Sequence, residues 1–256
     1  MIHPTAIVSS GARLGDNVSV GAYSIIGEHV EIGDGTSIGP HTTIAGRTRI
    51  GRDNRIYQFC SIGEPPQDKK YAGEPTELHI GDRNTIREFC TLNTGTAQDA
   101  GVTRVGDDNW IMAYVHIAHD CQVGSNAIFA NSTQLAGHVH IGDWAILGGF
   151  TGVHQFVRVG AHSFTAVSTV LLQDLPPYVM AAGNTAQARS INAEGLKRRG
   201  FSPDAVQAIK RAYKILYRSG LTLDEARAQI EAAASTTPEL CLLADFLSVP
   251  GRGIVR

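Results

Sequence analysis

Aliphatic residues recur at every sixth position through the first two thirds of the chain. The first run keeps one phase and consists of Ile2, Val8, Leu14, Val20, Ile26, Ile32, Ile38, Ile44, Ile50, Ile56 and Ile62, with Ile80, Ile86 and Leu92 returning in that phase. After a slip of one residue, the second run consists of Val105, Ile111, Ile117, Val123, Phe129, Leu135, Ile141, Leu147, Val153 and Val159. A helix repeats about every 3.6 residues and a strand every second residue, so neither alone produces this period. The pattern predicts a β-solenoid with three short strands per coil, one inward aliphatic side chain per strand, and glycine or small polar residues at the corners.

Two polar segments interrupt the repeat and predict loops that leave the coil. The first loop is expected at about residues 63–79, which are rich in proline and charge, and the second at about 93–104, where the phase slips. Loops that leave a repeat often carry function. The repeat fades after Val159 and ends at Leu175-Pro176-Pro177-Tyr178, so we expect a solenoid domain over residues 1–190.

Residues 191–256 have the features of a helical domain. Ser202-Pro203-Asp204 has the pattern of an N-cap followed by proline at the first helical position. The apolar residues that follow at helical spacing are Val206, Ile209, Tyr213, Leu216 and Tyr217. Thr222-Leu223-Asp224-Glu225 has a capping-box pattern that predicts a further helix. A domain this small buries little by itself, so we expect it to pack on the solenoid or on a neighbouring subunit.

Charge and cysteine content narrow the class of protein. Lys and Arg number 22 against 24 Asp and Glu, a balance that argues against a nucleic-acid-binding surface. The four cysteines Cys60, Cys90, Cys121 and Cys241 have neither metal-type nor disulfide-scaffold spacing, and we expect reduced thiols. No apolar run approaches the roughly 18 residues of a membrane span. The repeat begins at Ile2, without room for a signal peptide. These features predict a soluble cytoplasmic protein that does not span a membrane.

The densest group of reactive side chains is His116-Ile117-Ala118-His119-Asp120-Cys121. Three strands per coil place His119, Gly137 and Gln155 in one column on adjacent coils, and Asp120 and His138 about 5 Å apart at the strand spacing. His119 beside the unshielded amide of Gly137 would be a general base next to an oxyanion donor. The simpler interpretation is a solvated corner that carries polar residues. A zinc site built from histidines between subunits is a third interpretation.

Two basic segments suggest an anionic partner. Lys197-Arg198-Arg199 opens the helical domain, and Lys69-Lys70 lies in the first expected loop. Such clusters bind phosphates or acidic proteins. A solvated helix face is the better explanation for at least one of the three residues at 197–199.

Taken together, these motifs resemble one family, the bacterial UDP-N-acetylglucosamine O-acyltransferases that begin lipid A synthesis. The resemblance covers the whole chain. Besides the hexapeptide repeat, it rests on the segments Gln67–Pro75, His116–Cys121, Leu135–His138, His154–Phe156, Asp174–Val179 and Glu194–Phe201. The repeat alone is shared by many acyltransferases, whereas these segments in this order are specific.

The resemblance implies a mainly β fold, a left-handed parallel β-helix followed by a C-terminal α-helical domain, assembled as a homotrimer with active sites between subunits. It implies transfer of a 3-hydroxyacyl chain from acyl carrier protein to the 3-hydroxyl of UDP-N-acetylglucosamine. The implied catalytic residues are His119 as general base, Asp120 as its orienting partner and Gly137 as oxyanion donor. The implied substrate-binding residues are Asp68, Lys70, His116, His138, His154, Gln155, Asn192, Glu194 and Arg199, with Arg198 facing the acidic carrier protein. No metal or organic cofactor is expected, because the thioester is already activated.

Two positions depart from the family pattern. Asn93-Thr94-Gly95-Thr96 stands where the family usually has His-Arg-Gly-Thr, which keeps open an amide-forming reaction on a 3-amino analogue of the sugar nucleotide. Val167 stands where a glycine admits a long acyl chain in the family. Extra side-chain volume in a packed groove predicts a chain shorter than about fourteen carbons, about ten to twelve.

Other classes of protein share parts of this pattern. A zinc-dependent trimeric β-helix hydratase would have no need of the basic segment 197–199. A non-catalytic solenoid predicts smooth coils, which the two loops contradict. Another hexapeptide-repeat acyltransferase is a closer alternative, although the late N-acyltransferase of the pathway normally carries a further domain before its repeats.

Overall fold

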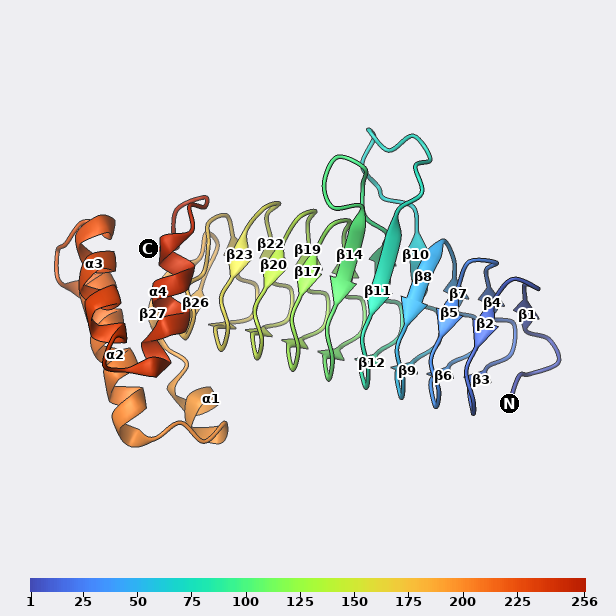
Figure 1. Ribbon diagram of the computed structural model, residues 1–256, viewed down its shortest axis with the longest axis horizontal. Coiled ribbons are helices and arrows are strands. Elements are labelled where there is room, and N and C mark those ends of the chain that lie inside the picture. The colour runs from blue at the N-terminus through green and yellow to red at the C-terminus, as the bar shows by residue number, and fades with distance from the viewer.

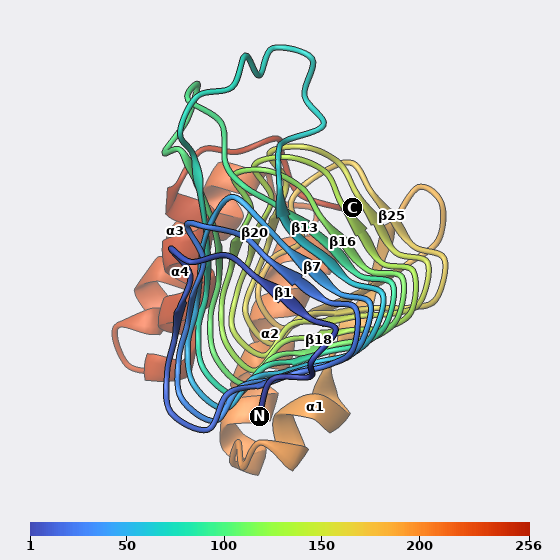
Figure 2. The same cartoon turned by 90° about the vertical axis from the view of Figure 1, so that its right-hand side faces the viewer.

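The computed structural model describes residues 1–256 and shows a three-sided solenoid with a helical domain at its C-terminal end (Figure 1). The strands form three sheets, and all strand pairs are parallel except β26 with β27. Viewed from the N-terminal end, the chain turns counterclockwise as it recedes, so the β-helix is left-handed (Figure 2). The predicted fold class is confirmed.

Up to β25 each sheet collects every third strand, β26 and β27 extend the sheet that contains β24, and we name each sheet after its first strand. The β1 sheet contains β1 (Ile7–Val8), β4 (Ile25–Ile26), β7 (Thr43–Ile44), β10 (Ser61–Glu64), β13 (Thr91–Asn93), β16 (His116–Ile117), β19 (Gln134–Leu135), β22 (Gly152–Val153) and β25 (Val170–Leu171). The β2 sheet contains β2 (Arg13–Leu14), β5 (Glu31–Ile32), β8 (Arg47–Ile50), β11 (Glu77–Ile80), β14 (Val102–Val105), β17 (Gln122–Val123), β20 (His140–Ile141) and β23 (Arg158–Val159). The β3 sheet contains β3 (Ser19–Val20), β6 (Ser37–Ile38), β9 (Arg55–Ile56), β12 (Thr85–Ile86), β15 (Trp110–Ile111), β18 (Ile128–Phe129), β21 (Ile146–Leu147), β24 (Phe164–Thr165), β26 (Val179–Ala182) and β27 (Gln187–Ile191).

The inward column of each sheet forms a continuous apolar core. From β4 onward, the inward residues of the β1 sheet are Ile26, Ile44, Ile62, Leu92, Ile117, Leu135, Val153 and Leu171, all at most 3% exposed. Each is paired with its counterpart on the next coil, as Ile117 is with Leu135. The period of six residues therefore arises because every short strand buries one side chain against the coils above and below it.

Two loops leave the solenoid where the β1 sheet turns into the β2 sheet, and both stand out from the coils in Figure 1. We call residues 65–76 the first loop and residues 94–101 the second loop. Both are shorter than the expected 63–79 and 93–104, because the flanking strands extend farther than the hexad pattern indicates. The four-residue strand β11 pairs along its whole length with β8 and β14, and Leu78 is fully buried.

The three corners of the coil use a common turn. We call the turn after β1-sheet strands the first corner, that after β2-sheet strands the second, and that after β3-sheet strands the third. Corner residues with positive φ include Asp120, Asp108 and Tyr114. Glycine and small polar residues were expected here, and the third corner shows otherwise, with five stacked rings whose neighbouring centroids lie 4.9–5.2 Å apart. These rings belong to Tyr23, His41, Phe59, Phe89 and Tyr114. Ring stacking between coils compensates for the backbone conformation that these residues adopt.

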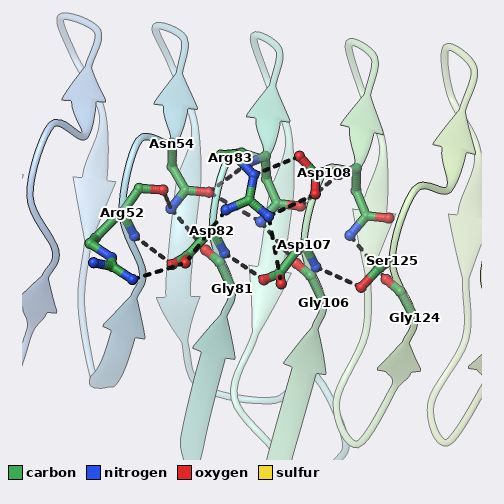
Figure 3. Close-up of polar contacts among 12 residues, drawn as sticks. Arg52, Asn54, Gly81, Asp82, Arg83, Gly106, Asp107, Asp108, Gly124 and Ser125 are labelled. Carbon is green, nitrogen blue, oxygen red and sulfur yellow. Dashed lines mark hydrogen bonds and ion pairs between the residues drawn. The ribbon is translucent and has the colours of Figure 1, made fainter.

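At the second corner, side-chain oxygens of one coil accept hydrogen bonds from backbone N–H groups of the previous coil (Figure 3). Asp82 accepts from Arg52, Asp107 from Asp82, and the Ser125 hydroxyl from Asp107, at 2.7–3.0 Å. Inside this polar ladder the direction is reversed, because Oδ1 of Asn54 accepts from the backbone and side-chain N–H groups of Asn84 on the next coil. The ladder satisfies backbone donors that no strand pairing reaches.

The C-terminal residues form α1 (Ala193–Arg198), α2 (Pro203–Arg218), α3 (Leu223–Ala234), the short 3-10 helix η1 (Pro238–Leu240) and α4 (Cys241–Ser248). The expected caps are present. The Ser202 hydroxyl accepts from the backbone N–H of Ala205, and Thr222 and Glu225 form a complete capping box. The last strand, β27, ends at Ile191, one residue beyond the expected end of the solenoid domain at residue 190. No helix is long and apolar enough to cross a membrane.

Candidate active site

His119 and Gly137 lie one above the other at the first corner, as the coil spacing predicts. The ring of His119 packs directly over Gly137, and a Cβ added to Gly137 would fall 2.4 Å from Cε1 of that ring. The His119 side chain is 14% exposed, so its ring is largely sheltered but reachable. Only glycine at 137 leaves room for this packing.

Asp120 fixes the orientation of the His119 ring. Its Oδ2 lies 2.9 Å from Nδ1 of His119, and the Asp120 side chain is fully buried. A carboxylate at this distance accepts the Nδ1 hydrogen, which leaves the lone pair of Nε2 free to accept a proton. This geometry favours the Nδ1–H tautomer of His119, the form that is suited to a general base.

The backbone N–H of Gly137 has no hydrogen-bond acceptor in the chain. Its neighbours are paired across coils, with Ala136 donating to the carbonyl of Val153 and His138 to that of His119. The free N–H belongs to a turn whose next residue, His138, has a φ of 61°. An unpaired backbone donor beside a general base is the arrangement that stabilises an oxyanion.

His138 completes the cluster at the next position of the corner. Its ring stacks on Phe156 at 4.3 Å between centroids and meets the His119 ring edge to face at 5.0 Å. Its Nδ1 lies 2.6 Å from Oδ2 of Asp99 and 3.9 Å from Oδ2 of Asp120. The expected stacking of Asp120 and His138 is present, while the contact with Asp99 has no counterpart in the sequence expectations.

His116 lies on β16, on the face of the β1 sheet that leads into the first corner. Its Nδ1 is 2.7 Å from the hydroxyl of Thr91 on the adjacent coil. Burial lowers the pKa of His116, and the nearby His119 lowers it further. A neutral His116 can contact a hydroxyl group of a bound sugar without adding charge to the cluster. His154 and Gln155 lie one coil beyond His138, and both are exposed.

The two loops flank this cluster and carry further expected residues. Asp68 and Lys70 lie in the first loop, where the Asp68 carboxylate accepts from the backbone N–H of Lys70 at 3.0 Å. Asn93 and Thr94 are buried where the second loop begins. The Asn93 side chain donates to the carbonyls of Glu64 and Pro65, and the Thr94 hydroxyl accepts from the hydroxyl of Thr76. Both residues therefore connect the bases of the two loops.

Asn192, Glu194 and Arg199 lie apart from the His119 cluster. They line a pocket of about 660 Å³ between α1 and the β3 sheet, together with Trp144 and Arg198. The first corner is the edge of the three-sided solenoid that lies opposite the β3 sheet. The apolar core therefore separates this pocket from His119. In one chain, therefore, the expected site residues form two groups.

Contacts within the α1 pocket hold its polar residues in place. The Arg199 guanidinium donates to the carbonyl of Trp144 at 2.9 Å and lies over the Trp144 ring. Asn192 caps α1 by accepting from the N–H of Gly195. The Glu194 carboxylate pairs with Lys197 at 3.0 Å. Arg198 is exposed at the surface beside this pocket.

One group of side chains has the spacing of metal ligands. The group consists of His119, Asp120 and His138. Each residue offers one possible ligand atom, and these three atoms lie within 4.8 Å of one another. His116 is not a member of this group. Two of its members, His119 and Asp120, are already joined by the contact between Nδ1 and Oδ2.

Sequence reasoning missed two residues that complete the cluster. Thr96 and Asp99, both in the second loop, contact Asp120 and His138, respectively. A loop has no periodicity, so no register argument could place these side chains. The phase slip within residues 93–104 was the only signal that a segment with its own contacts begins there.

The solenoid and the His119 corner define the class of hexapeptide-repeat transferases. The family profile described as "Bacterial transferase hexapeptide (six repeats)" matches residues 11–46 and 103–137, and the profile described as "Udp N-acetylglucosamine O-acyltransferase; Domain 2" matches residues 174–255. The chain is 66% identical over its full length to the acyl-[acyl-carrier-protein]–UDP-N-acetylglucosamine O-acyltransferase of Thiobacillus denitrificans, of which it covers 99%, and 66% identical over its full length to that of Albidiferax ferrireducens, again covering 99%. The chain therefore belongs to the acyl-[acyl-carrier-protein]–UDP-N-acetylglucosamine O-acyltransferase family and is an acyltransferase.

Solved structures agree with this assignment. The structure of LpxA from Acinetobacter baumannii superposes with a TM-score of 0.97 at 48% identity and covers 100% of this chain and 99% of its own. The UDP-N-acetylglucosamine acyltransferase of Francisella novicida gives a TM-score of 0.98 at 45% identity, with 100% and 94% covered. The resemblance predicted from the sequence motifs is confirmed.

Proposed function

We propose that the chain transfers a 3-hydroxyacyl group from acyl carrier protein to the 3-hydroxyl of UDP-N-acetylglucosamine at the first corner. The observation that carries this proposal is the His119 ring, held by Asp120 and packed over the free N–H of Gly137. The names of the full-length relatives supply the substrates, and all of those named above are O-acyltransferases. The burial of Asn93 and Thr94 beneath the loops offers no support for the amide-forming alternative.

Each step of the reaction has a residue positioned for it. Nε2 of His119 accepts the proton of the sugar hydroxyl as that oxygen attacks the thioester carbonyl. The carbonyl oxygen becomes negatively charged and accepts a hydrogen bond from the Gly137 N–H. When the carbon–sulfur bond breaks, the thiolate leaves and takes the proton back from His119. Asp120 holds the ring while it is charged. The chemistry needs no metal or cofactor.

We propose that a homotrimer forms complete sites between subunits. The His119 cluster and the α1 pocket lie on opposite sides of the core, so a single chain cannot present both to one nucleotide sugar. In the proposed assembly, one subunit supplies His119 and its neighbours, with Asp68, Lys70, His116, His138, His154 and Gln155 around the sugar and diphosphate. Its partner supplies Asn192, Glu194 and Arg199 to the nucleotide, and the exposed Arg198 meets the acidic carrier protein.

A transfer assay with purified protein tests the chemistry. His119→Ala is expected to lower kcat by about 10²–10⁴-fold, the usual contribution of a general base. His29→Ala, at the same corner on an earlier coil, is the matched control and should retain full activity because His29 is exposed and makes no contact with the cluster. An active His119→Ala variant would refute the assignment of the base, and absence of transfer by the wild-type protein would refute the substrates.

Subunit complementation tests the shared site. His119→Ala and Arg199→Ala are each expected to be nearly inactive, but mixed trimers formed by co-refolding should regain activity, because some sites then contain an intact residue from each chain. If the mixture stays as inactive as the separate variants, the site is not shared between subunits.

The same assay tests donor length and the acceptor atom. Val167 lies at the third corner with 67% of its surface exposed, beside Gly149 of the adjacent coil. In a trimer, the valine side chain would fill the end of an acyl groove, so we propose donors of about ten to twelve carbons. Val167→Gly should shift the preference toward about fourteen carbons. Equal use of both donors by the wild-type protein would show that Val167 does not set the length of the acyl chain. Faster transfer to the 3-amino analogue than to UDP-N-acetylglucosamine would favour the amide-forming reaction.

We place this reaction in the cytoplasm. Cys60, Cys90, Cys121 and Cys241 are all free thiols, and burial raises the pKa of the Cys121 thiol to about 12. Unpaired cysteines are typical of a reducing compartment.

A further inference from the structure

The second loop reaches the catalytic corner through two residues that the proposed reaction does not use directly. Thr96 contacts Asp120, and Asp99 contacts His138. We propose that Thr96 and Asp99 are positioning residues, which hold the two neighbouring histidines in their working orientations through separate contacts. This inference rests on the proposed function, because it assigns roles relative to His119 as the base.

Thr96 holds the carboxylate of Asp120. The Thr96 hydroxyl donates to Oδ2 at 2.6 Å, and its backbone N–H reaches Oδ1 at 2.9 Å and Oδ2 at 3.1 Å. Thr96 is 1% exposed, so water does not compete for these bonds. Oδ2 is the same oxygen that faces Nδ1 of His119. The hydroxyl of Thr96 thus determines where the partner of the base lies.

The backbone of Asp120 is held as well. Its N–H donates to the hydroxyl of Thr103, at the start of the strand that follows the loop. With the backbone and both carboxylate oxygens bonded, Asp120 has one orientation, and the His119 ring follows it. A base held in this way keeps its Nε2 at a constant position above Gly137, which is the preorganisation that fast proton transfer requires.

Asp99 acts on the second histidine. Its Oδ2 lies 2.6 Å from Nδ1 of His138, so Nδ1 carries the hydrogen and Nε2 points away from the carboxylate. Phe156 stacks on one face of the His138 ring and restricts rotation. His119–Asp120 and His138–Asp99 are thus two histidine–aspartate pairs whose rings meet edge to face. The second pair is suited to presenting Nε2 to the sugar nucleotide.

The loop is itself fastened to the solenoid. The N–H of Thr94 donates to the carbonyl of Glu64, and that of Gly95 to the carbonyl of Glu77. A Cβ on Gly95 would fall 2.2 Å from the backbone nitrogen of Val102 and 2.7 Å from Oδ1 of Asp120. Glycine at 95 is therefore required for Thr96 to come within reach of the carboxylate.

Steady-state kinetics on the complete protein test the role of Thr96. Thr96→Val has the same shape but no hydroxyl, and we expect kcat to fall by about 10- to 100-fold with the KM for UDP-N-acetylglucosamine within about twofold of the wild-type value, as for a misplaced catalytic group. Thr96→Ser retains the donor and should restore most of kcat. Wild-type kcat in Thr96→Val, or an equal loss in Thr96→Ser, would overturn the proposal.

Asp99→Asn tests the second pair, with Gln98→Ala as the matched control. Gln98 is exposed on the same loop and forms no hydrogen bond, so Gln98→Ala should behave as wild type. Asp99→Asn removes the charge beside His138 and so weakens one charge-assisted hydrogen bond. We expect the KM for UDP-N-acetylglucosamine to rise by about 3- to 10-fold as a result, while kcat changes less. An unchanged KM, or the same change in Gln98→Ala, would overturn the role of Asp99.

Nitrogen NMR of histidine-labelled protein without substrate separates this proposal from the proposed function. The His119 signals, assigned with His119→Ala, should show the Nδ1–H tautomer in the wild type and a mixture of tautomers in Thr96→Val, while Asp99→Asn should move only the His138 signals. This result is expected whatever the substrate is. Identical His119 spectra in wild type and Thr96→Val would refute positioning by Thr96 even if the transfer reaction is confirmed.

Discussion

At the second corner and at the first corner the chain makes the same turn, but the polar groups have different partners. Asp108 and Asp120 both have a φ of 58°. At the second corner, backbone N–H groups donate to side chains of the next coil, as Asp82 donates to Asp107. At the first corner, the Asp120 carboxylate accepts from His119 and from the second loop, and the N–H of Gly137 is free.

This difference shows how one repeat provides both stability and chemistry. At the second corner, side-chain oxygens accept from backbone N–H groups of the previous coil, so these donors are not available to a ligand. Replacing the side chain by hydrogen at Gly137 exposes the backbone donor and admits the His119 ring above it. The Gly137 N–H has no such side-chain acceptor and remains a free donor beside the His119 ring.

The largest effect is expected from closing the space above Gly137. In Gly137→Ala, the added methyl group would lie 2.4 Å from the His119 ring, so the ring must move away from the N–H. We expect kcat to fall by about 10²–10³-fold, the effect of losing an oxyanion donor. Stability should change little, because the displaced atoms belong to a side chain that can rotate. Transfer kinetics together with urea unfolding measure both quantities, and a loss of stability with intact kcat would contradict the comparison.

A glycine-to-alanine change at the second corner, one position earlier in the turn, should have the opposite result. In Gly106→Ala, the methyl group would lie 2.7 Å from the carbonyl oxygen of Gly124, which is backbone and cannot rotate away. Overpacking of this kind costs about 1–3 kcal/mol of unfolding free energy. The urea midpoint, measured at one fixed protein concentration, should fall while kcat per folded protein stays at the wild-type value. Lower kcat in Gly106→Ala would mean that the two corners are coupled.

The contrast between the corners also explains which features the sequence could predict. Period six follows from one buried side chain per short strand, so the coils and the stacking of His119 over Gly137 could be counted along the chain. Thr96 could not be found in this way, because its position depends on how the second loop closes onto Asp120. The aromatic rings of the third corner, such as Phe59, were also unexpected, since hexad spacing says nothing of which residues tolerate positive φ.

Removing one member of the polar ladder should have a smaller effect. In Asp107→Ala, the backbone N–H of Asp82 loses the acceptor that it reaches at 2.7 Å. An unpaired, partly buried donor costs about 1 kcal/mol. Asp107→Asn keeps an acceptor oxygen and should recover most of this loss in urea unfolding. If both variants are as stable as the wild type, water replaces the ladder and the second corner is not held by these bonds.

The last prediction concerns a pH effect at the C-terminal end of the second corner, where α1 covers His162. Burial, together with the charge of Arg199, lowers the pKa of His162 to about 4. Because an unfolded histidine titrates near 6.5, the unfolded chain binds more protons between these values, so stability should decrease as pH falls from about 6.5 to about 4. His162→Phe keeps a stacked ring at this corner and removes the titration. Urea unfolding at pH 7 and pH 5 should therefore show a smaller decrease for His162→Phe than for the wild type. His116 and His140, whose pKa values are also lowered by burial, contribute equally to both proteins, so an identical decrease would show that His162 is not held neutral by its position beneath α1.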